Sequence, residues 1–383
     1  MNGGPADAKA LAAAYVWGYP LVAVHRTCAT HGGPGRGMVA RDRLATPADR
    51  TVVAPNNDTL YASGWFDLRA GEVSVQVDAA RLGDRYWSVM LLDAHTHVRY
   101  VSRRSFTATT RVTLGSIGTP TVWVLARVLV DGPDDLAAAR AALDGITVTQ
   151  AVGRAAAAAD RPEVAGGRGA RAFFADLRAA VAVDPPGPQH PPPPERMAAA
   201  LDRLERTEDT VLDAAVAAGR ALMAENRGVD RVGNGWGIRS RGADFDGDVA
   251  YRAAFAQVSL AGHLPAENRS YSRAFDGAAA TLRFPPGGEP PVDGFWSLCL
   301  YGPDMFLVGN EIDRYSIGDR TPGLRWDPDG GLTLWVGPDR PADPANWLPA
   351  PPGPSVMALR AYEGRPEVVD ASWFPPDLTP VAP

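Results

Sequence analysis

The stretch Phe295-Trp-Ser-Leu-Cys-Leu-Tyr301 decides the fold of the C-terminal third, because a nearly continuous run of apolar and aromatic residues of this length is typical of a buried strand. Similar strand-like segments occur after residue 279, at Thr281–Phe284, Met305–Val308, Leu332–Val336 and Ser355–Tyr362. Turn sequences such as Pro-Pro-Gly-Gly and Asp-Pro-Asp-Gly-Gly lie between them. Short strands at these intervals predict a sandwich, a jelly roll or an irregular barrel rather than a parallel sheet.

The N-terminal part contains a second strand-rich region, from about residue 52 to residue 130. The predicted strands are Glu72–Val77, Tyr86–Leu92, Val98–Val101, Arg111–Leu114 and Thr121–Val130, and Asp144–Gln150 is a candidate for one more. In the first of these, polar and apolar residues alternate, as they do in a strand with one wet face. Because both ends of the chain are rich in predicted strands, an arrangement of two sandwiches stays an alternative.

Helical patterns occupy the rest of the chain. Helices are predicted at residues 6–29, Leu136–Leu143, Glu195–Asn226 and Val249–Leu260, and Pro20 is expected to end or kink the first of them. Residues 184–194 contain seven prolines and are expected to form an extended spacer. The sequence therefore predicts an α+β fold, in which two β-rich, sandwich- or jelly-roll-like domains are joined by a helical middle segment. The expected boundaries are 1–150, 151–248 and 249–383.

The composition narrows the classes of function. The 383 residues include 45% hydrophobic and 21% charged residues, which is typical of a globular protein. The net charge of −6 argues against a nucleic-acid partner, and no segment approaches the ~18 apolar residues of a membrane span. Two cysteines are too few for a disulfide scaffold. We expect a cytoplasmic protein with a small-molecule substrate and no membrane partner, and assembly into a homo- or hetero-oligomer stays open.

Lysine is almost absent. Lys9 is the one lysine among 38 basic residues, and it lies close to the N-terminus. Schiff-base catalysis, a pyridoxal cofactor and a P-loop are therefore disfavoured, and no cofactor is expected. Any cationic site must be built from arginine, whose guanidinium group binds carboxylate, phosphate or sulfate through two parallel hydrogen bonds.

Several longer strings resemble a known family. In the N-terminal part they are Ala54-Pro-Asn-Asn-Asp-Thr-Leu-Tyr61 and Arg85-Tyr-Trp-Ser-Val-Met-Leu-Leu-Asp93, and in the C-terminal part Pro290-Pro-Val-Asp-Gly-Phe-Trp-Ser-Leu-Cys-Leu-Tyr301, Arg314-Tyr-Ser-Ile-Gly-Asp-Arg320 and Asn346-Trp-Leu-Pro-Ala-Pro351. Together these resemble the bacterial proteins that pair domain of unknown function 1254 with domain of unknown function 1214. The resemblance implies an N-terminal α/β part, a helical middle and a C-terminal jelly-roll-like domain. It implies little chemistry.

The first candidate site is a polar loop that precedes an apolar strand. It contains Asn56, Asn57, Asp58 and Tyr61. These side chains have the chemistry to orient a polar substrate, with Asn56, Asn57 and Tyr61 as binding residues and Asp58 in proton transfer. The structural alternative is an Asx-turn that fixes the loop, with Tyr61 packed inside.

The second candidate site is the Asp93-Ala-His95-Thr-His97 segment. Along an extended strand, residues two apart share a face, so these three side chains are expected to project together. Asp93 and His95 are our candidates for an acid–base pair. Two histidines and a carboxylate also have the ligand types of an iron or zinc site, although a structural histidine pair is favoured over metal binding.

The third candidate site lies in the loop after residue 308. Asn310, Arg314 and Arg320 are candidate substrate-binding residues, and Tyr315 is a candidate catalytic donor. The two arginines have the chemistry to clamp an anionic group. The alternative is a network of Arg and Asp residues that braces an irregular loop.

These patterns favour an enzyme without a cofactor, in specialised metabolism, that acts on a polar small molecule. The expected reaction is an acid–base elimination, cyclisation or intramolecular substitution that releases an anion, as in a lyase. Two alternatives stay open. One is a non-catalytic binding or partner subunit of a heteromeric complex, and the other is a metal-dependent enzyme centred on the His95 and His97 segment.

Overall fold

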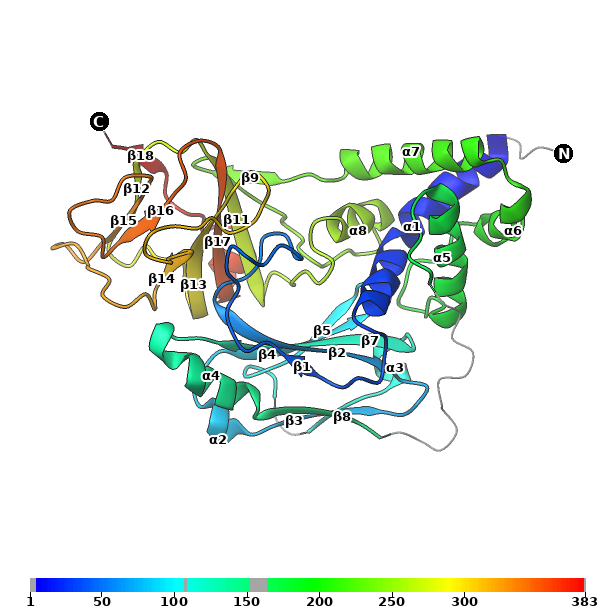
Figure 1. Cartoon of the computed structure of the whole chain (residues 1–383), viewed down its shortest axis with the longest axis horizontal. Helices are drawn as coiled ribbons and strands as arrows, with labels where there is room; N and C mark the ends of the chain where they lie inside the picture. Colours follow the sequence, from blue (N-terminus) through cyan, green and yellow to red (C-terminus); the bar gives the residue numbers. More distant parts are fainter. Residues whose placement is uncertain (1–4, 107–108, 152–163, 382–383) are drawn as a thin grey trace.

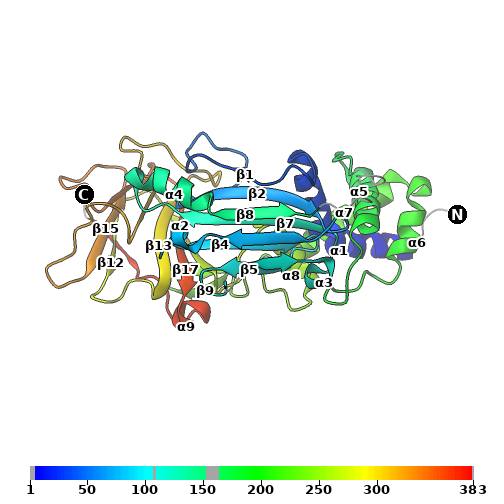
Figure 2. The ribbon, with the colours of Figure 1, turned by 90° about the horizontal axis from the view of Figure 1, so that it is seen from below.

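The computed structural model describes residues 5–106, 109–151 and 164–381. It has an α+β fold with two β-rich halves and a helical region (Figure 1). Figure 2 shows the order along the long axis: the C-terminal β-sandwich, the N-terminal sheets, and the helices. Part of the predicted helical middle, residues 152–163, lies outside the described residues.

The N-terminal half contains two antiparallel sheets. The five-stranded sheet has the order β1-β2-β7-β4-β5, with the strands β1 Val39–Ala40, β2 Thr59–Asp67, β4 Trp87–Asp93, β5 Val98–Ser102 and β7 Thr121–Leu129. The three-stranded sheet has the order β6-β3-β8, with β3 Val73–Val77, β6 Thr110–Val112 and β8 Ile146–Gln150. The helices α2 Ala79–Leu82, α3 Leu114–Ile117 and α4 Leu136–Leu143 accompany them. Leu60, Val89 and Val124 face the apolar core that these elements share.

The C-terminal half is a β-sandwich. Its larger sheet has the order β14-β13-β17-β11-β10-β9, with β9 Asp230–Gly233, β10 Trp236–Ile238, β11 Asn268–Phe275, β13 Val292–Tyr301, β14 Ser316–Gly318 and β17 Ser355–Gly364. Its smaller sheet has the order β16-β15-β12-β18, with β12 Ala280–Phe284, β15 Leu332–Gly337, β16 Trp347–Pro349 and β18 Leu378–Pro380. Trp296 and Leu298 from one sheet and Leu282 and Leu334 from the other form one core. A short helix, α9 Pro366–Val369, follows β17.

The helical region consists of α1 Pro5–Thr30, α5 Ala170–Val183, α6 Met197–Asp202, α7 Asp209–Glu225 and α8 Val249–Ala256. These helices form an apolar core of their own around Trp17, Phe174 and Leu212. The helix predicted over residues 6–29 is present as α1, and it continues through Pro20, so Pro20 does not end it. Among the helices of the described residues, none has the combination of length and apolar character needed to cross a bilayer.

Two predicted elements differ from the structure. The helix expected over Glu195–Asn226 is broken between α6 and α7, where the Arg171 side chain donates hydrogen bonds to the carbonyls of Leu204 and Thr207. These bonds satisfy carbonyls that a continuous helix would have paired internally. The strand expected at Met305–Val308 is reduced to one bridge, between Tyr301 and Leu307.

Candidate functional site

The two β-rich halves meet through polar faces. The strand register places polar residues of neighbouring strands side by side on these faces. In the five-stranded sheet, Arg127 of β7 lies opposite Tyr61 of β2 on one side and Ser88 of β4 on the other. In the larger sheet of the sandwich, Arg360 of β17 lies opposite Ser297 of β13. Because side chains alternate along a strand, these residues occupy the faces turned away from the apolar cores.

We call the residues between these faces the interdomain cluster. Its members are polar and come from both halves and from the segment before β11; they are Asn56, Asp58, Tyr61, Tyr86, Ser88, Tyr100, Arg127, His263, Glu267, Ser297, Arg320, Arg360 and Tyr362. Many of them are buried, and Arg127 is only 3% exposed. Buried charged side chains at this density are typical of functional sites.

Asp58 and Tyr362 are connected through Asn56. The Asn56 Nδ2 atom donates to the Tyr362 hydroxyl at 2.5 Å and lies 3.4 Å from Asp58 Oδ2. The Ser297 hydroxyl also donates to Asp58 Oδ2, at 2.7 Å, and the Arg320 guanidinium lies 3.7 Å from Oδ1. A carboxylate and a phenol from different halves are thereby fixed close to one another.

Two further pairs complete the interdomain cluster. The Tyr86 hydroxyl donates to Glu267 Oε1 at 2.5 Å, and the Tyr100 hydroxyl lies 3.1 Å from His263 Nδ1. Burial lowers the pKa of His263 well below its ordinary value, and the charges of Arg127 and Arg360 act in the same direction. Burial also raises the pKa of Glu267, against the hydrogen bond from Tyr86.

Tyr100 and His263 combine desolvated surroundings with some accessible surface. Both are of intermediate exposure, and burial shifts the pKa values of both strongly. Polar side chains in such surroundings are candidates for a functional site.

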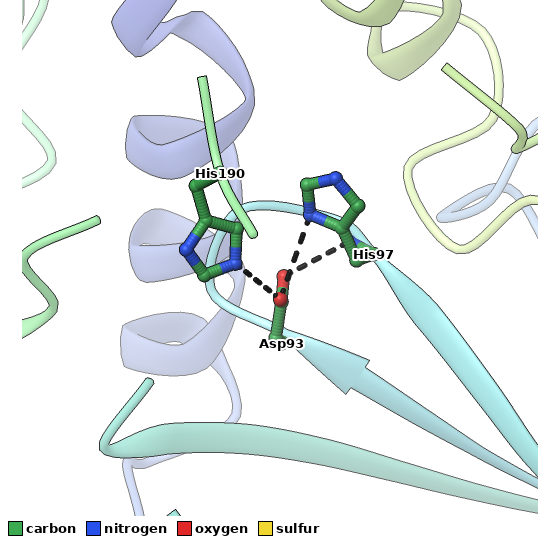
Figure 3. A group of neighbouring side chains, drawn as sticks. All are labelled: Asp93, His97 and His190. Atoms are coloured by element: carbon green, nitrogen blue, oxygen red, sulfur yellow. Dashed lines mark hydrogen bonds and ion pairs between the residues drawn. The ribbon is translucent and has the colours of Figure 1, made fainter. Parts of the chain in front are cut away.

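A second polar cluster lies at the turn between β4 and β5. Figure 3 shows Asp93, His97 and His190, whose potential ligand atoms all lie within 4.8 Å of one another. Asp93 Oδ2 is 2.7 Å from His190 Nε2 and 3.6 Å from His97 Nδ1. Burial disfavours the ionised form of Asp93, but hydrogen bonds from His190 and His97 outweigh it and hold the pKa well below its ordinary value.

The extended strand expected through Asp93, His95 and His97 is wrong. Strand β4 ends at Asp93, whose Oδ1 accepts hydrogen bonds from the backbone N–H groups of His95 and His97. The chain turns there with a positive φ of 68° at Thr96. His95 stacks on the His190 ring, with the ring centroids 4.5 Å apart, and its Nε2 lies 3.2 Å from the Asp184 carbonyl.

The protonation of His190 bears on the metal hypothesis. Its Nδ1 accepts the Gly187 backbone N–H at 2.8 Å, so the proton of the neutral ring sits on Nε2 and points at Asp93. A metal on Nε2 would move that proton to Nδ1, where it would meet the Gly187 N–H. The hydrogen bonds therefore favour a structural clasp between the proline-rich segment and the β4–β5 turn over a metal centre.

The pH dependence of stability tests whether His95, beside this clasp, is buried in its neutral form. Burial lowers the pKa of His95 to about 3, so this ring stays neutral in the folded protein while the unfolded chain binds a proton below about pH 6.5. Stability is therefore lost as the pH falls, by about 1.4 kcal/mol between about pH 7.5 and 5.5 from this residue. Urea unfolding at both values measures the difference, and it should shrink by that amount in His95→Gln. An equal difference in both proteins would contradict the assignment.

The structure separates the sequence-predicted residues into three groups. Asn56, Asp58, Tyr61 and Arg320 belong to the interdomain cluster. Asn57 lies beside it and bridges the halves, since it donates to the Ala45 carbonyl and accepts from the Ser316 hydroxyl. Asp93 and His95 lie at the clasp.

The remaining three predicted residues brace the loop after β13. Arg314 donates to the carbonyls of Pro344, Ala345 and Trp347, Asn310 bonds to the backbone of Arg314, and the Tyr315 hydroxyl donates to Asp313. Sequence reasoning did not single out Tyr86, Tyr100, Arg127, Glu267, Arg360 or Tyr362, and it gave His263 no role. For Arg127 and Arg360 a signal exists, because Arg127 is the one charge in the apolar strand β7 and Arg360 interrupts the apolar run of β17.

Comparisons with known proteins agree with the two halves. The model described as Protein of unknown function (DUF1254) matches residues 37–150, and the one described as Protein of unknown function (DUF1214) matches residues 266–366. No protein with curated annotation matches the chain.

Two solved structures are similar to this chain. The VPA0106 protein from Vibrio parahaemolyticus is 18% identical, with a TM-score of 0.69 over 98% of this chain and 100% of that one, and it shares the fold. A putative uncharacterized protein from Burkholderia cenocepacia is 15% identical, with a TM-score of 0.46 over 91% of this chain and 84% of that one. The two matched regions show that the protein belongs to the family that joins a DUF1254 domain to a DUF1214 domain.

Proposed function

We propose that the protein is an enzyme that moves protons on a polar small molecule bound at the interdomain cluster. The observation that carries this proposal is the environment of Tyr362. Its hydroxyl oxygen accepts a hydrogen bond from Asn56, and among the described residues nothing accepts its proton. Burial raises the pKa of this phenol well above its ordinary value, with Tyr61 adding to the effect. Tyr362 is therefore protonated and its O–H can donate to a substrate atom, which is the starting state of a general acid. Its raised pKa means that it gives up the proton only to a strongly basic leaving group.

Asp58 is the partner base. Its Oδ2 is occupied by Ser297 and Asn56, and its Oδ1 has the more distant Arg320 as its neighbour. In the proposed reaction, Asp58 takes a proton from the substrate while Tyr362 gives one to the departing group. The electron pair of the broken bond to hydrogen forms a double bond in an elimination or a ring bond in a cyclisation, and the leaving group departs with the electron pair of its own bond and takes the proton from Tyr362. Solvent then returns the proton from Asp58 to the phenol.

This reaction class fits an enzyme of specialised metabolism, and the position between two domains is a common one for small-molecule sites. A binding subunit would need no phenol–carboxylate pair aligned through one amide. If the proposed function is right, removal of the Tyr362 hydroxyl alone should lower the rate of proton transfer.

Proton transfer is testable without knowledge of the natural substrate. The wild-type protein is incubated in D2O with pools of small hydroxy, amino and carboxylic acids, and mass spectrometry detects deuterium uptake or a product that has lost a leaving group. Tyr362→Phe is expected to lower any such rate by 10²–10⁴-fold while it stays folded. Tyr19→Phe, a partly buried tyrosine in the helical region, is the matched control and should keep the rate. A Tyr362→Phe rate equal to that of wild type would remove this role.

A further inference from the structure

Arg127 is a buried cation without a counter-ion. It lies in the middle of the five-stranded sheet, 3% exposed, and among the described residues no carboxylate forms an ion pair with it. Within the described part of the chain, its Nε and Nη1 atoms have no acceptor within hydrogen-bond geometry, and Nη2 lies 3.9 Å from the Met90 sulfur. The Tyr61 ring lies 5.2 Å from the guanidinium carbon, and its phenol contributes a polar contact. An unpaired guanidinium in such surroundings is costly unless an anion joins it.

Arg360 approaches the same region from the facing sheet. Its Nη2 donates to the Ala54 carbonyl at 3.0 Å, and its Nη1 is a second buried donor without an acceptor. The charges of both arginines act on the same two side chains, His263 and Tyr362. Both guanidinium groups are therefore close enough to His263 and Tyr362 for their charges to act on these side chains.

The carboxylates of this region have other partners. Asp58 lies 3.7 Å from the Arg320 guanidinium, which also pairs with Asp319 at 3.3 Å, and Glu267 accepts the hydrogen bond of Tyr86. The imidazole of His263 stays neutral, because burial lowers its pKa. Among the described residues, Arg127 and Arg360 are thus left without an ion pair, and the hydroxyls of Tyr61 and Tyr100 lie near Arg127 as further polar groups.

We propose that Arg127 and Arg360 form an oxyanion subsite that binds a carboxylate, sulfate or phosphate group of the substrate. The subsite rests on the proposed function for its role in catalysis, but the binding of an anion can be measured independently. A guanidinium fork matches the two oxygens of such a group, and its charge is not screened in a buried site. The bound anion is either the group that anchors the substrate or the group that departs.

The test uses inorganic sulfate, inorganic phosphate and acetate as probes, against chloride at equal ionic strength. Thermal unfolding and titration calorimetry of the wild-type protein are expected to show stabilisation and saturable binding by at least one oxyanion. Arg127→Gln and Arg127→Lys should weaken that binding at least tenfold, because the first lacks the charge and the second lacks the fork. Arg325→Gln, which removes a surface arginine with 73% side-chain exposure, is the matched control and should bind as wild type does.

The outcomes separate the two proposals. Tyr362→Phe should bind the oxyanion normally, so loss of turnover with retained anion binding supports both. If no oxyanion raises the Tm of the wild-type protein more than chloride does, the subsite is refuted, even where Arg127→Gln fails to fold. Unchanged affinity in a folded Arg127→Gln variant refutes it as well. Anion binding that depends on Arg127 without any proton transfer would refute the catalytic role and keep the subsite.

Discussion

Asp58→Ala is expected to lower the free energy of unfolding by about 3–5 kcal/mol, because it removes one partner from a buried charged network. The carboxylate is 4% exposed and lies where β2 meets the sandwich. Without it, the Ser297 hydroxyl and the Asn56 amide lose an acceptor, and the Arg320 guanidinium loses its closest buried charge. Urea unfolding followed by tryptophan fluorescence measures the change.

Two variants give this prediction its controls. Asp58→Asn keeps the shape and one acceptor oxygen, so its loss should be smaller than that of Asp58→Ala. Asp42→Ala removes a carboxylate with 78% side-chain exposure whose one ion pair is 3.3 Å long, and it should change stability by less than about 0.5 kcal/mol. Equal stability of Asp58→Ala and wild type would mean that the two halves do not depend on this network.

Asp184→Ala should be comparably damaging, at about 3–5 kcal/mol, for a related reason at the other end of the sheet. The carboxylate is fully buried where α5 ends. It accepts the backbone N–H and the hydroxyl of Thr121 at 2.6 Å each, and it pairs with His25 at 2.9 Å. One side chain therefore joins α5, α1 and the start of β7, and its loss leaves a buried N–H without an acceptor.

The clasp at the proline-rich segment sharpens that second experiment. His190 lies on the same segment as Asp184, and His190→Ala breaks its contact with Asp93 while Asp184 stays in place. If the two contacts act independently, the losses of stability of the two single variants should add in the double variant. Calorimetry of the single and double variants gives the coupling. If Asp184→Ala unfolds at the wild-type temperature, the proposed joint is wrong.

The sequence was sufficient for the two β-rich regions. Alternation and apolar runs located β3, β4, β7, β13 and β17 to within a few residues, because each has one face or both in an apolar core. Strand β11, Asn268–Phe275, was not predicted. Its sequence carries two arginines and three small polar residues, since part of it faces polar surroundings rather than the core.

The site was only partly predictable. Asn56 and Asp58 stand in a recognisable loop, so the sequence marks them, whereas the importance of Tyr362 depends on a contact with a residue 306 positions earlier in the chain. The same limit holds for His190, which lies in a proline-rich segment with no periodic pattern that would place it beside Asp93. The alternation of polar and apolar residues predicts which face of a strand is polar, but it does not predict which other strand or segment that face contacts.

Asp58 and Ser297 are bonded although they are 239 residues apart, and each belongs to the stretch matched by a different family model. Recombination that exchanged one of these stretches for a distant counterpart would bring mismatched polar surfaces together. We therefore expect the two matched stretches to be inherited together. A replacement at Arg127 should be accompanied by compensating replacements around Arg360. Paired substitutions across genomes would be the trace of that shared history.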